Sequence, residues 1–253
     1  MTDDDRLALA ARLAREAAAV ILAARRAGVT VSAKGDLTPV TEADHAAERL
    51  IVSALRAEDP GMPVIAEEEV AAGQVGPLGD SWWLIDPLDG TREFAQGRDE
   101  FAVCLGFVRK GRPVLGAVAL PASGELFWGR VGHGAWKEDA TGRRPISARK
   151  PPPEGLTVFA SRHHADDPRI ARFVAGLPLA RLVNAGSALK FCRVAEGAAD
   201  LYPRFGRTME WDTAGPQAVV EAAGGSVTTA DGAPLAYGKP GFVNPDFVCR
   251  GRS

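Results

Sequence analysis

Carboxylate residues follow two short apolar runs of this chain. Asp86 comes directly after residues 82–85, Asp89 lies three positions further on, and Glu67 follows residues 64–66. Apolar runs of this length are typical of buried strands, and two neighbouring strand ends would let their carboxylates converge on one cation. Oxygen ligands suit Mg²⁺, which also binds phosphate oxygens of substrates. Taken separately, each segment also fits an exposed turn or a solvated acidic loop.

The residues around Asp89 indicate a phosphate site. Pro87 is expected to force a turn after Asp86, Gly90 lets the backbone approach a ligand closely, and Thr91 is expected to open a helix. The N–H groups at such a helix start can bind a phosphate group. The alternative is a surface turn capped by an aspartate.

Two further acidic residues lie at expected helix starts. Asp44 ends the segment Thr41-Glu42-Ala43-Asp44, which matches the T-x-x-D capping box. Asp212 precedes Thr213 and could cap the helix that follows it. A capping role alone would explain both residues.

Hydrophobic periodicity predicts the elements that position these residues. One helix is expected from near Thr2 to Gly28, and a second from near Thr41 to just before Asp59. Strands are expected at 64–66, 82–85, 101–108, 114–120, 126–128 and 134–136. After the three prolines at 151–153, strands at 156–160 and 182–183 alternate with helices near 167–176, 187–198 and 212–223. We therefore expect an α and β protein, with an N-terminal α+β half containing an antiparallel sheet (1–150) and a C-terminal α/β half (151–253).

The composition is that of a globular protein that handles small molecules. The 253 residues include 30 Lys and Arg against 32 Asp and Glu, a formal net charge of −2, whereas a nucleic-acid binder usually carries a basic surplus. The three cysteines lack metal-ligand spacing and fit a reducing compartment. The start of the chain is acidic, unlike a signal peptide, and no apolar stretch approaches the roughly 20 residues that cross a bilayer. We expect a cytoplasmic protein without a transmembrane segment; a peripheral membrane contact and a homodimer stay open.

Four ordered motifs together resemble those of the inositol monophosphatase superfamily of metal-dependent, lithium-sensitive phosphatases. The motifs are Lys34-Gly35-Asp36-Leu37-Thr38-Pro39-Val40-Thr41-Glu42-Ala43-Asp44, Ala66-Glu67-Glu68, Asp86-Pro87-Leu88-Asp89-Gly90-Thr91 and Trp211-Asp212-Thr213-Ala214. The resemblance runs from about residue 34 to about residue 247. It implies the layered αβαβα sandwich of the sugar phosphatases, with two or three Mg²⁺ ions as cofactors.

Within this superfamily the chain is most similar to bacterial 3′(2′),5′-bisphosphate nucleotidases of the CysQ type. The similarity lies in residues 88–94, 186–192 and 201–206. It implies hydrolysis of the 3′-phosphate of adenosine 3′,5′-bisphosphate to AMP and phosphate, with 3′-phosphoadenylyl sulfate as a further substrate and a place in sulfate assimilation. The alternatives are an inositol monophosphatase, a histidinol-phosphate phosphatase, or a catalytically silent module that senses a cation or a nucleotide.

The resemblance also implies roles for individual residues. The implied side-chain metal ligands are Glu67, Asp86, Asp89 and Asp212, and Leu88 would add its backbone carbonyl. Asp44 and Thr91, together with Glu67, would position and deprotonate the attacking water. The implied substrate contacts are Gly90, Thr91, His164, Ser187, Lys190, Arg204 and Asp212.

Some residues depart from the family pattern or depend on local structure. Ser187 is expected to open the helix that carries Lys190, so that both could meet a phosphate on one helix face. Ala66, His163 and Gly215-Pro216 differ from the usual family residues, which puts fine substrate preference in doubt. Pro216 is expected near the first turn of its helix, where a proline is tolerated.

Overall fold

The computed structural model describes residues 1–28, 31–33, 39–162 and 167–253. Its helices are α1 (Asp3–Ala27), α2 (Glu42–Glu58), α3 (Glu67–Ala71), α4 (Thr91–Ala95), α5 (Pro168–Val174), α6 (Leu189–Ala195) and α7 (Glu210–Ala222). Its strands are β1 (Val31–Ala33), β2 (Pro39–Thr41), β3 (Val64–Ala66), β4 (Ser81–Asp89), β5 (Ala102–Arg109), β6 (Arg112–Leu120), β7 (Glu125–Arg130), β8 (Gly134–Asp139), β9 (Gly142–Ile146), β10 (Leu156–Ser161), β11 (Leu179–Ala185), β12 (Leu201–Arg204), β13 (Ser226–Thr229) and β14 (Phe247–Arg250).

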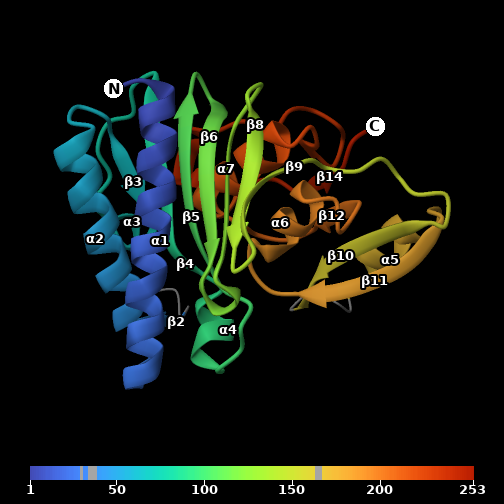
Figure 1. Cartoon of the computed structure of the whole chain (residues 1–253), viewed down its shortest axis with the longest axis horizontal. Coiled ribbons are helices and arrows are strands. Elements are labelled where there is room, and N and C mark those ends of the chain that lie inside the picture. The colour runs from blue at the N-terminus through green and yellow to red at the C-terminus, as the bar shows by residue number, and fades with distance from the viewer. Residues whose placement is uncertain (29–30, 34–38, 163–166) are drawn as a thin grey trace.

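These elements form five layers (Figure 1). Helices α1 and α2 cover one face of a seven-stranded sheet, and α7 packs on its other face. Helices α6 and α7 separate this sheet from a five-stranded sheet, whose far face is covered by α5. The αβαβα sandwich expected from the motifs is confirmed.

The two N-terminal helices begin and end where the sequence predicts. The Thr2 side chain accepts from the Asp5 N–H at the start of α1, and the Asp5 carboxylate accepts from the Thr2 N–H. Gly28, with φ 102°, follows the last residue of the helix. Thr41 and Asp44 form the same reciprocal capping box on α2. Such boxes satisfy N–H groups that a helix start otherwise leaves unpaired.

The larger sheet has the order β3-β4-β5-β6-β7-β8-β9. Strand β3 pairs in parallel with β4, and every following pair is antiparallel. The hairpin and the two strands predicted after it are confirmed, whereas β9 was not predicted. Its burial pattern is mostly exposed at this sheet edge, so its sequence lacks the apolar run that indicates a strand.

The smaller sheet has the order β11-β10-β12-β14-β13. Consecutive residues of β10 point to opposite faces of the sheet. Phe159 packs toward α6 and α7, whereas Val158 packs toward α5. Tyr202 and Leu201 divide in the same way. This alternation is what the two-residue period of a strand dictates when both faces are covered.

The chain passes from the larger to the smaller sheet between β9 and β10, at the three prolines. One apolar cluster nevertheless contains residues of both halves, including Phe127 from the first and Trp211 from the second. The division into an N-terminal unit of residues 1–150 and a C-terminal unit of residues 151–253 stays a prediction.

Helix α7 approaches the β5–β6 hairpin at backbone contact. A Cβ atom on Gly106 would lie 2.5 Å from the Gly215 nitrogen, and one on Gly116 would lie 2.5 Å from the Gly215 oxygen. A Cβ atom on Gly215 would lie 2.4 Å from the Leu105 oxygen. Only glycine fits at these three positions, and the close approach fixes the depth of α7 between the sheets.

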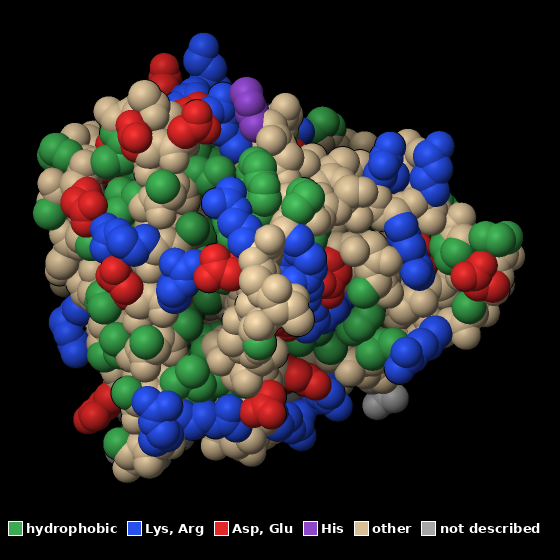
Figure 2. All heavy atoms as spheres, viewed as in Figure 1, with side chains coloured by type: hydrophobic (Ala, Val, Ile, Leu, Met, Phe, Trp, Pro, Cys, Tyr) green, Lys and Arg blue, Asp and Glu red, His purple; other side chains and the backbone are tan. Residues whose placement is uncertain are grey.

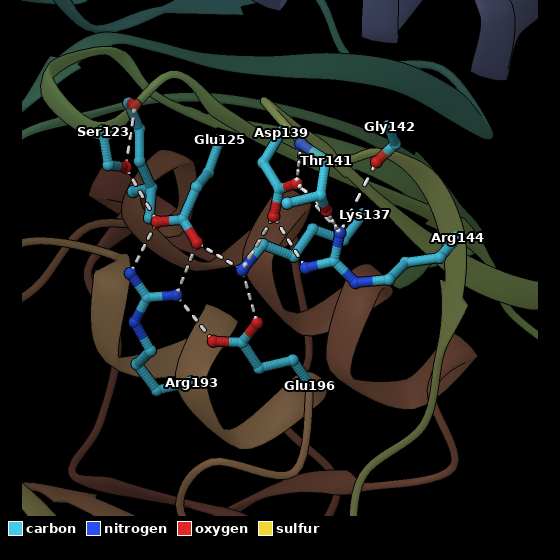
Figure 3. Close-up of polar contacts among 10 residues, drawn as sticks. Ser123, Glu125, Lys137, Asp139, Thr141, Gly142, Arg144, Arg193 and Glu196 are labelled. Atoms are coloured by element: carbon cyan, nitrogen blue, oxygen red, sulfur yellow. Dashed lines mark hydrogen bonds and ion pairs between the residues drawn. The ribbon is translucent and has the colours of Figure 1, made fainter.

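An ionic cluster fastens α6 to the β7–β8 edge of the larger sheet (Figure 3). Lys137 is 6% exposed and contacts Glu125, and its Nζ lies 2.7 Å from Glu196 Oε2. Arg193 of α6 donates to Glu125 and to Glu196. Burial raises the pKa of Glu125, but the bonds from Arg193 and Lys137 outweigh it and lower this pKa to about 2. The pairing of these charges holds α6 against the first sheet.

The surface carries both signs of charge. Figure 2 shows basic and acidic side chains interspersed over the face that it displays, in line with the small net charge. Among the described residues, no helix is both long enough and apolar enough to span a membrane.

Candidate active site

Three of the predicted metal ligands meet at one point. Glu67, Asp86 and Asp212 each offer one carboxylate oxygen, and these oxygens lie within 4.8 Å of one another. Glu67 is the first residue of α3 directly after β3, and Asp86 lies in the adjacent parallel strand β4. Asp212 comes from the first turn of α7. Because β3 and β4 run in parallel, Glu67 and Asp86 lie at the same end of the sheet. Helix α7, which packs on the face of this sheet, places Asp212 beside them.

The charges in this cluster oppose one another. Burial raises the pKa of Asp86 well above its ordinary value, and the charge of Glu67 raises it further. Burial likewise raises the pKa of Asp212, with added repulsion from Asp89 and Glu67. Buried like charges are costly unless protons or a cation neutralise them. Because every donor is a carboxylate oxygen, the cluster fits a hard divalent cation such as Mg²⁺.

Asp89 lies beside the three clustered residues but is held differently. Its Oδ2 accepts a hydrogen bond from the backbone N–H of Ala188. Burial raises the pKa of Asp89 to about 6, although the Lys190 ammonium acts in the opposite direction. One oxygen of Asp89 is therefore tied to the second half of the chain, and its role as a metal ligand stays a prediction.

The segment around Leu88 differs from the expected turn. Strand β4 runs on to Asp89 instead of ending at Asp86, and its pairing with β5 is irregular between these two residues. Pro87 lies in this irregularity, where its missing N–H costs no ladder bond. Leu88 donates its N–H to Asp86 Oδ1 over 3.0 Å, and its carbonyl oxygen lies 2.9 Å from Thr91 Oγ1.

Asp44 serves both of the roles that the sequence left open. Its Oδ2 accepts from the Thr41 N–H over 2.8 Å, as a capping box requires. Its Oδ1 accepts from Thr91 Oγ1 over 2.9 Å. Thr91 is the first residue of α4, as predicted, and Gly90 before it has φ 91°, in the left-handed region.

Glu48, which was not among the predicted site residues, fixes the segment that carries Glu67. Its two oxygens accept from the N–H groups of Glu68 and Glu69 over 2.7 and 2.9 Å at the start of α3. Burial raises the pKa of Glu48 to about 7. The spacing could have indicated this residue, because Glu48 lies one helical turn after Asp44 and therefore on the same face of α2.

Asp212 is not the residue that precedes its helix. Helix α7 begins at Glu210, so Asp212 lies in the first turn, and its Oδ2 accepts from the Met209 N–H over 2.9 Å. Pro216 lies inside α7 and not near its first turn. Because proline has no N–H, the Asp212 carbonyl lacks the usual intrahelical donor four residues on.

A cavity of about 130 Å³ adjoins the acidic residues. Its lining includes Asp89 and five predicted substrate contacts, namely Gly90, Ser187, Lys190, Arg204 and Asp212.

Lys190 is buried rather than solvated. It is 2% exposed, and its Nζ donates to the carbonyl oxygens of Ala185, over 3.1 Å, and of Ser187. Burial lowers the pKa of Lys190 to about 8, although the charge of Asp89 opposes this shift.

The other predicted substrate contacts have different surroundings. Ser187 does not open α6, which starts at Leu189; it lies in the preceding turn with φ 48°. Arg204 donates from Nη2 to the Arg207 carbonyl over 3.1 Å, while its buried Nε has no hydrogen-bond partner among the residues that the structure describes. His164 lies outside the described residues, as do residues 34–38 of the first motif.

Comparison with known proteins supports the same family. The model of the inositol monophosphatase family matches residues 3–248. The 3′(2′),5′-bisphosphate nucleotidase CysQ of Salmonella typhimurium is 41% identical over 215 residues, which cover 85% of this chain and 86% of that protein. The protein of the same name from Escherichia coli K12 is also 41% identical, over 86% of this chain and 87% of its own.

Solved structures agree. CysQ from Bacteroides thetaiotaomicron, described as a bacterial member of the inositol monophosphatase family, superposes with a TM-score of 0.82 at 32% identity. The superposition covers 98% of each chain. The resemblance seen in the four sequence motifs is thereby confirmed. The chain belongs to the inositol monophosphatase family.

Proposed function

We propose that the chain is a Mg²⁺-dependent 3′(2′),5′-bisphosphate nucleotidase that converts adenosine 3′,5′-bisphosphate to AMP and phosphate. The observation that carries this proposal is the position of the Glu67–Asp86–Asp212 cluster beside a cavity lined by the cations Lys190 and Arg204. A substrate with one phosphate at the acidic cluster and a second anionic group in the cavity matches this distribution of charge. 3′-Phosphoadenylyl sulfate meets the same requirement. The two relatives at 41% identity bear the name of this activity.

Mg²⁺ would be held by the side chains of Glu67, Asp86, Asp89 and Asp212 and by the Leu88 carbonyl, as two or three ions. Bound there, it supplies positive charge to the phosphate oxygens, a lowered pKa for a coordinated water and stabilisation of the leaving alkoxide. The raised pKa values of Asp86 and Asp212 support this assignment: burial raises both and repulsion from neighbouring carboxylates adds to it, and a bound cation would compensate the buried negative charge.

Thr91 and Asp44 would take the proton of the attacking water. Thr91 Oγ1 lies 2.9 Å from Asp44 Oδ1 and 2.9 Å from the Leu88 carbonyl oxygen. Its hydroxyl can therefore donate to Asp44 while its lone pairs accept from water. Thr91 would take one water proton while passing its own to Asp44, and Glu67 would help to position the water. The resulting hydroxide would attack phosphorus and the bond to the 3′-oxygen would break. That oxygen would take a proton from solvent water to give the hydroxyl of AMP, and no phosphoenzyme would form.

Mg²⁺ is expected to stabilise the protein more at pH 8 than at pH 5.5. The pKa values of Asp86 and Asp212 are raised on folding, so without a cation their contribution to stability falls as pH rises above about 4. Protons and Mg²⁺ compete for the same oxygens. At one hundred times Kd the ion adds about 2.7 kcal/mol, or roughly 5–10 °C in Tm.

The measurement is thermal unfolding with and without Mg²⁺ at both pH values, using Asp212→Asn as the comparison. This variant should lose most of the Mg²⁺-dependent shift. Equal shifts at the two pH values would contradict a carboxylate site.

Arg204→Gln is expected to raise KM for adenosine 3′,5′-bisphosphate about 10- to 100-fold while changing KM for a simple sugar phosphate little. A hydrogen bond to a charged group contributes roughly 1.5–3 kcal/mol, and the buried Nε of Arg204, beside the cavity, has no partner within the described part of the chain. Steady-state kinetics with both substrates tests this, with the exposed Arg172→Gln as a control. Equal effects on both substrates would count against nucleotide recognition.

One assay separates this activity from its rivals. Phosphate release is measured from adenosine 3′,5′-bisphosphate, 3′-phosphoadenylyl sulfate, an inositol monophosphate and histidinol phosphate, with and without Mg²⁺ and Li⁺. We expect the two nucleotides to be the best substrates, with Mg²⁺ required and Li⁺ inhibitory. A preference for inositol or histidinol phosphate would replace the proposed substrate, and no release at all would indicate a silent sensing module.

A further inference from the structure

The turn between β11 and α6 forms one wall of the cavity, and carboxylates from the first half of the chain hold its backbone. The Gly186 N–H donates to Glu100 Oε2 over 2.7 Å, and the Ala188 N–H donates to Asp89. Between them, Ser187 has φ 48°, a left-handed conformation that a non-glycine residue adopts only when its surroundings impose it. The turn is therefore held in place from outside.

Glu100 is itself held by an arginine at the end of β10. Arg162 donates from Nε to Glu100 Oε2 over 3.0 Å and from Nη2 to Oε1, which makes a two-point contact. The same Nη2 lies 3.3 Å from the Asn184 carbonyl, one residue before the end of β11. Burial acts to raise the pKa of Glu100, but the bonds from Arg162 and Gly186 outweigh it and lower the pKa. Glu100 is thus an anion that joins three segments.

Glu100 also touches the segment that carries Asp89. A Cβ atom on Gly90 would lie 2.8 Å from the Glu100 carbonyl oxygen and 3.2 Å from the Ser187 Cβ. A Cβ atom on Gly186 would lie 3.1 Å from Glu100 Oε2. The Glu93 side chain also reaches the turn, with its Cγ 2.9 Å from the same Cβ position on Gly186, and β11 points toward α4 in the fold (Figure 1). The turn therefore packs directly against Glu100 and the α4 segment, and the hydrogen bond from Gly186 fixes its backbone to Glu100.

The Arg162–Glu100 pair is partly exposed. The side chains are 38% and 24% exposed, and solvent screening limits what a pair of this exposure contributes to folding, although its two-point contact strengthens it. Its contacts converge on the turn whose carbonyl oxygens, those of Ala185 and Ser187, accept from the Lys190 ammonium. Movement of the turn would shift Ser187 and Lys190 together.

We infer that Glu100 and Arg162 are a positioning pair that sets the turn of residues 185–188 against the Asp89–Gly90 segment and so shapes the part of the cavity that holds the substrate's second anionic group. The pair does not contact the reacting atoms. The inference rests on the proposed function for its kinetic consequence, but its structural consequence is independent of any substrate.

Two readouts test the pair in the full-length protein. Glu100→Ala removes the acceptor of the Gly186 N–H, and Arg162→Ala releases the Glu100 side chain that supplies this acceptor. Each is expected to speed amide hydrogen exchange of a peptide spanning residues 185–190 at least about tenfold without ligand. Each is also expected to raise KM for adenosine 3′,5′-bisphosphate about tenfold, with kcat within about threefold of the parent. Arg162→Lys keeps the charge but not the two-point contact and should give an intermediate KM.

The chain offers a matched control in Arg144→Ala. Arg144 makes a two-point contact with Asp139, which also accepts a backbone N–H, from Thr141 over 2.9 Å (Figure 3). Arg144 is 43% exposed, close to the value for Arg162, but it does not line the cavity. This variant should change neither readout.

The outcomes separate the two proposals. Unchanged exchange at residues 185–190, or faster exchange with KM and kcat both within twofold of the parent, would overturn the positioning role. A parent protein that cleaves another phosphate ester instead would overturn the proposed substrate only. In that case the exchange readout stands, and the KM comparison is made with the ester that is cleaved.

Discussion

Asp212→Asn is expected to lower kcat/KM for adenosine 3′,5′-bisphosphate about a thousandfold while the protein stays folded. The amide keeps an oxygen that can accept from the Met209 N–H, so the start of α7 is retained. It removes one of the three carboxylates that meet within 4.8 Å and so weakens the attraction for a cation. A thousandfold loss corresponds to about 4 kcal/mol of transition-state stabilisation, within the range that a metal ion supplies.

The same substitution should leave stability without Mg²⁺ unchanged or raise it. The pKa of Asp212 is raised by burial and by repulsion from Asp89 and Glu67, so a neutral side chain relieves an unfavourable charge. Steady-state kinetics and thermal unfolding without Mg²⁺ measure the two effects. Asp80→Asn, at an exposed position outside the site, is the control. Near-normal turnover of Asp212→Asn at limiting Mg²⁺ would refute the metal assignment.

Gly215→Ala is expected to lower the free energy of unfolding by about 3 kcal/mol and to abolish most activity. The new Cβ would lie 2.4 Å from the Leu105 carbonyl oxygen and 2.8 Å from the carbonyl carbon, so α7 or β5 must move. Overpacking of this kind costs about 1–3 kcal/mol, and more where only backbone can yield. Because Asp212 lies one turn before Gly215 on α7, the displacement also separates the carboxylates.

Thermal unfolding is the measurement, with an expected fall in Tm of about 6–12 °C. Gly176→Ala serves as the control, because a Cβ atom there meets nothing within 4 Å. A Gly215→Ala protein with parental Tm and activity would show that the close approach of α7 does not position Asp212.

Several features could be predicted because they depend on neighbouring residues. Both capping boxes and the β5–β6 hairpin lie where local patterns indicate. Asp44 shows the limit of such patterns. Its capping role could be predicted from the four residues of the capping box. Its bond to Thr91 joins α2 to α4, and only the family resemblance suggested this bond.

Other features could not be predicted from the sequence because they depend on burial and on contacts between distant segments. Lys190 was predicted as a substrate contact, but nothing in the sequence indicated that it is 2% exposed with its ammonium on backbone carbonyl oxygens. Glu100 and Arg162 gave no signal at all, since their residue types suit any exposed surface and their pairing joins the approach to β5 with the end of β10. Strand β4 continued beyond Asp86 because pairing with β5 supports it past Pro87.

The sequence by itself determined the family, the two N-terminal helices and strands β3 to β8, and which acidic residues could bind a metal, since these follow from residue type, spacing and short-range periodicity. Tertiary structure alone decided that Glu67, Asp86 and Asp212 meet while an oxygen of Asp89 is bound to Ala188. The reason is the packing of α7 onto β5 and β6 through glycines far apart in the chain. Distances between such segments are set by how closely their backbones can approach, which no local pattern encodes.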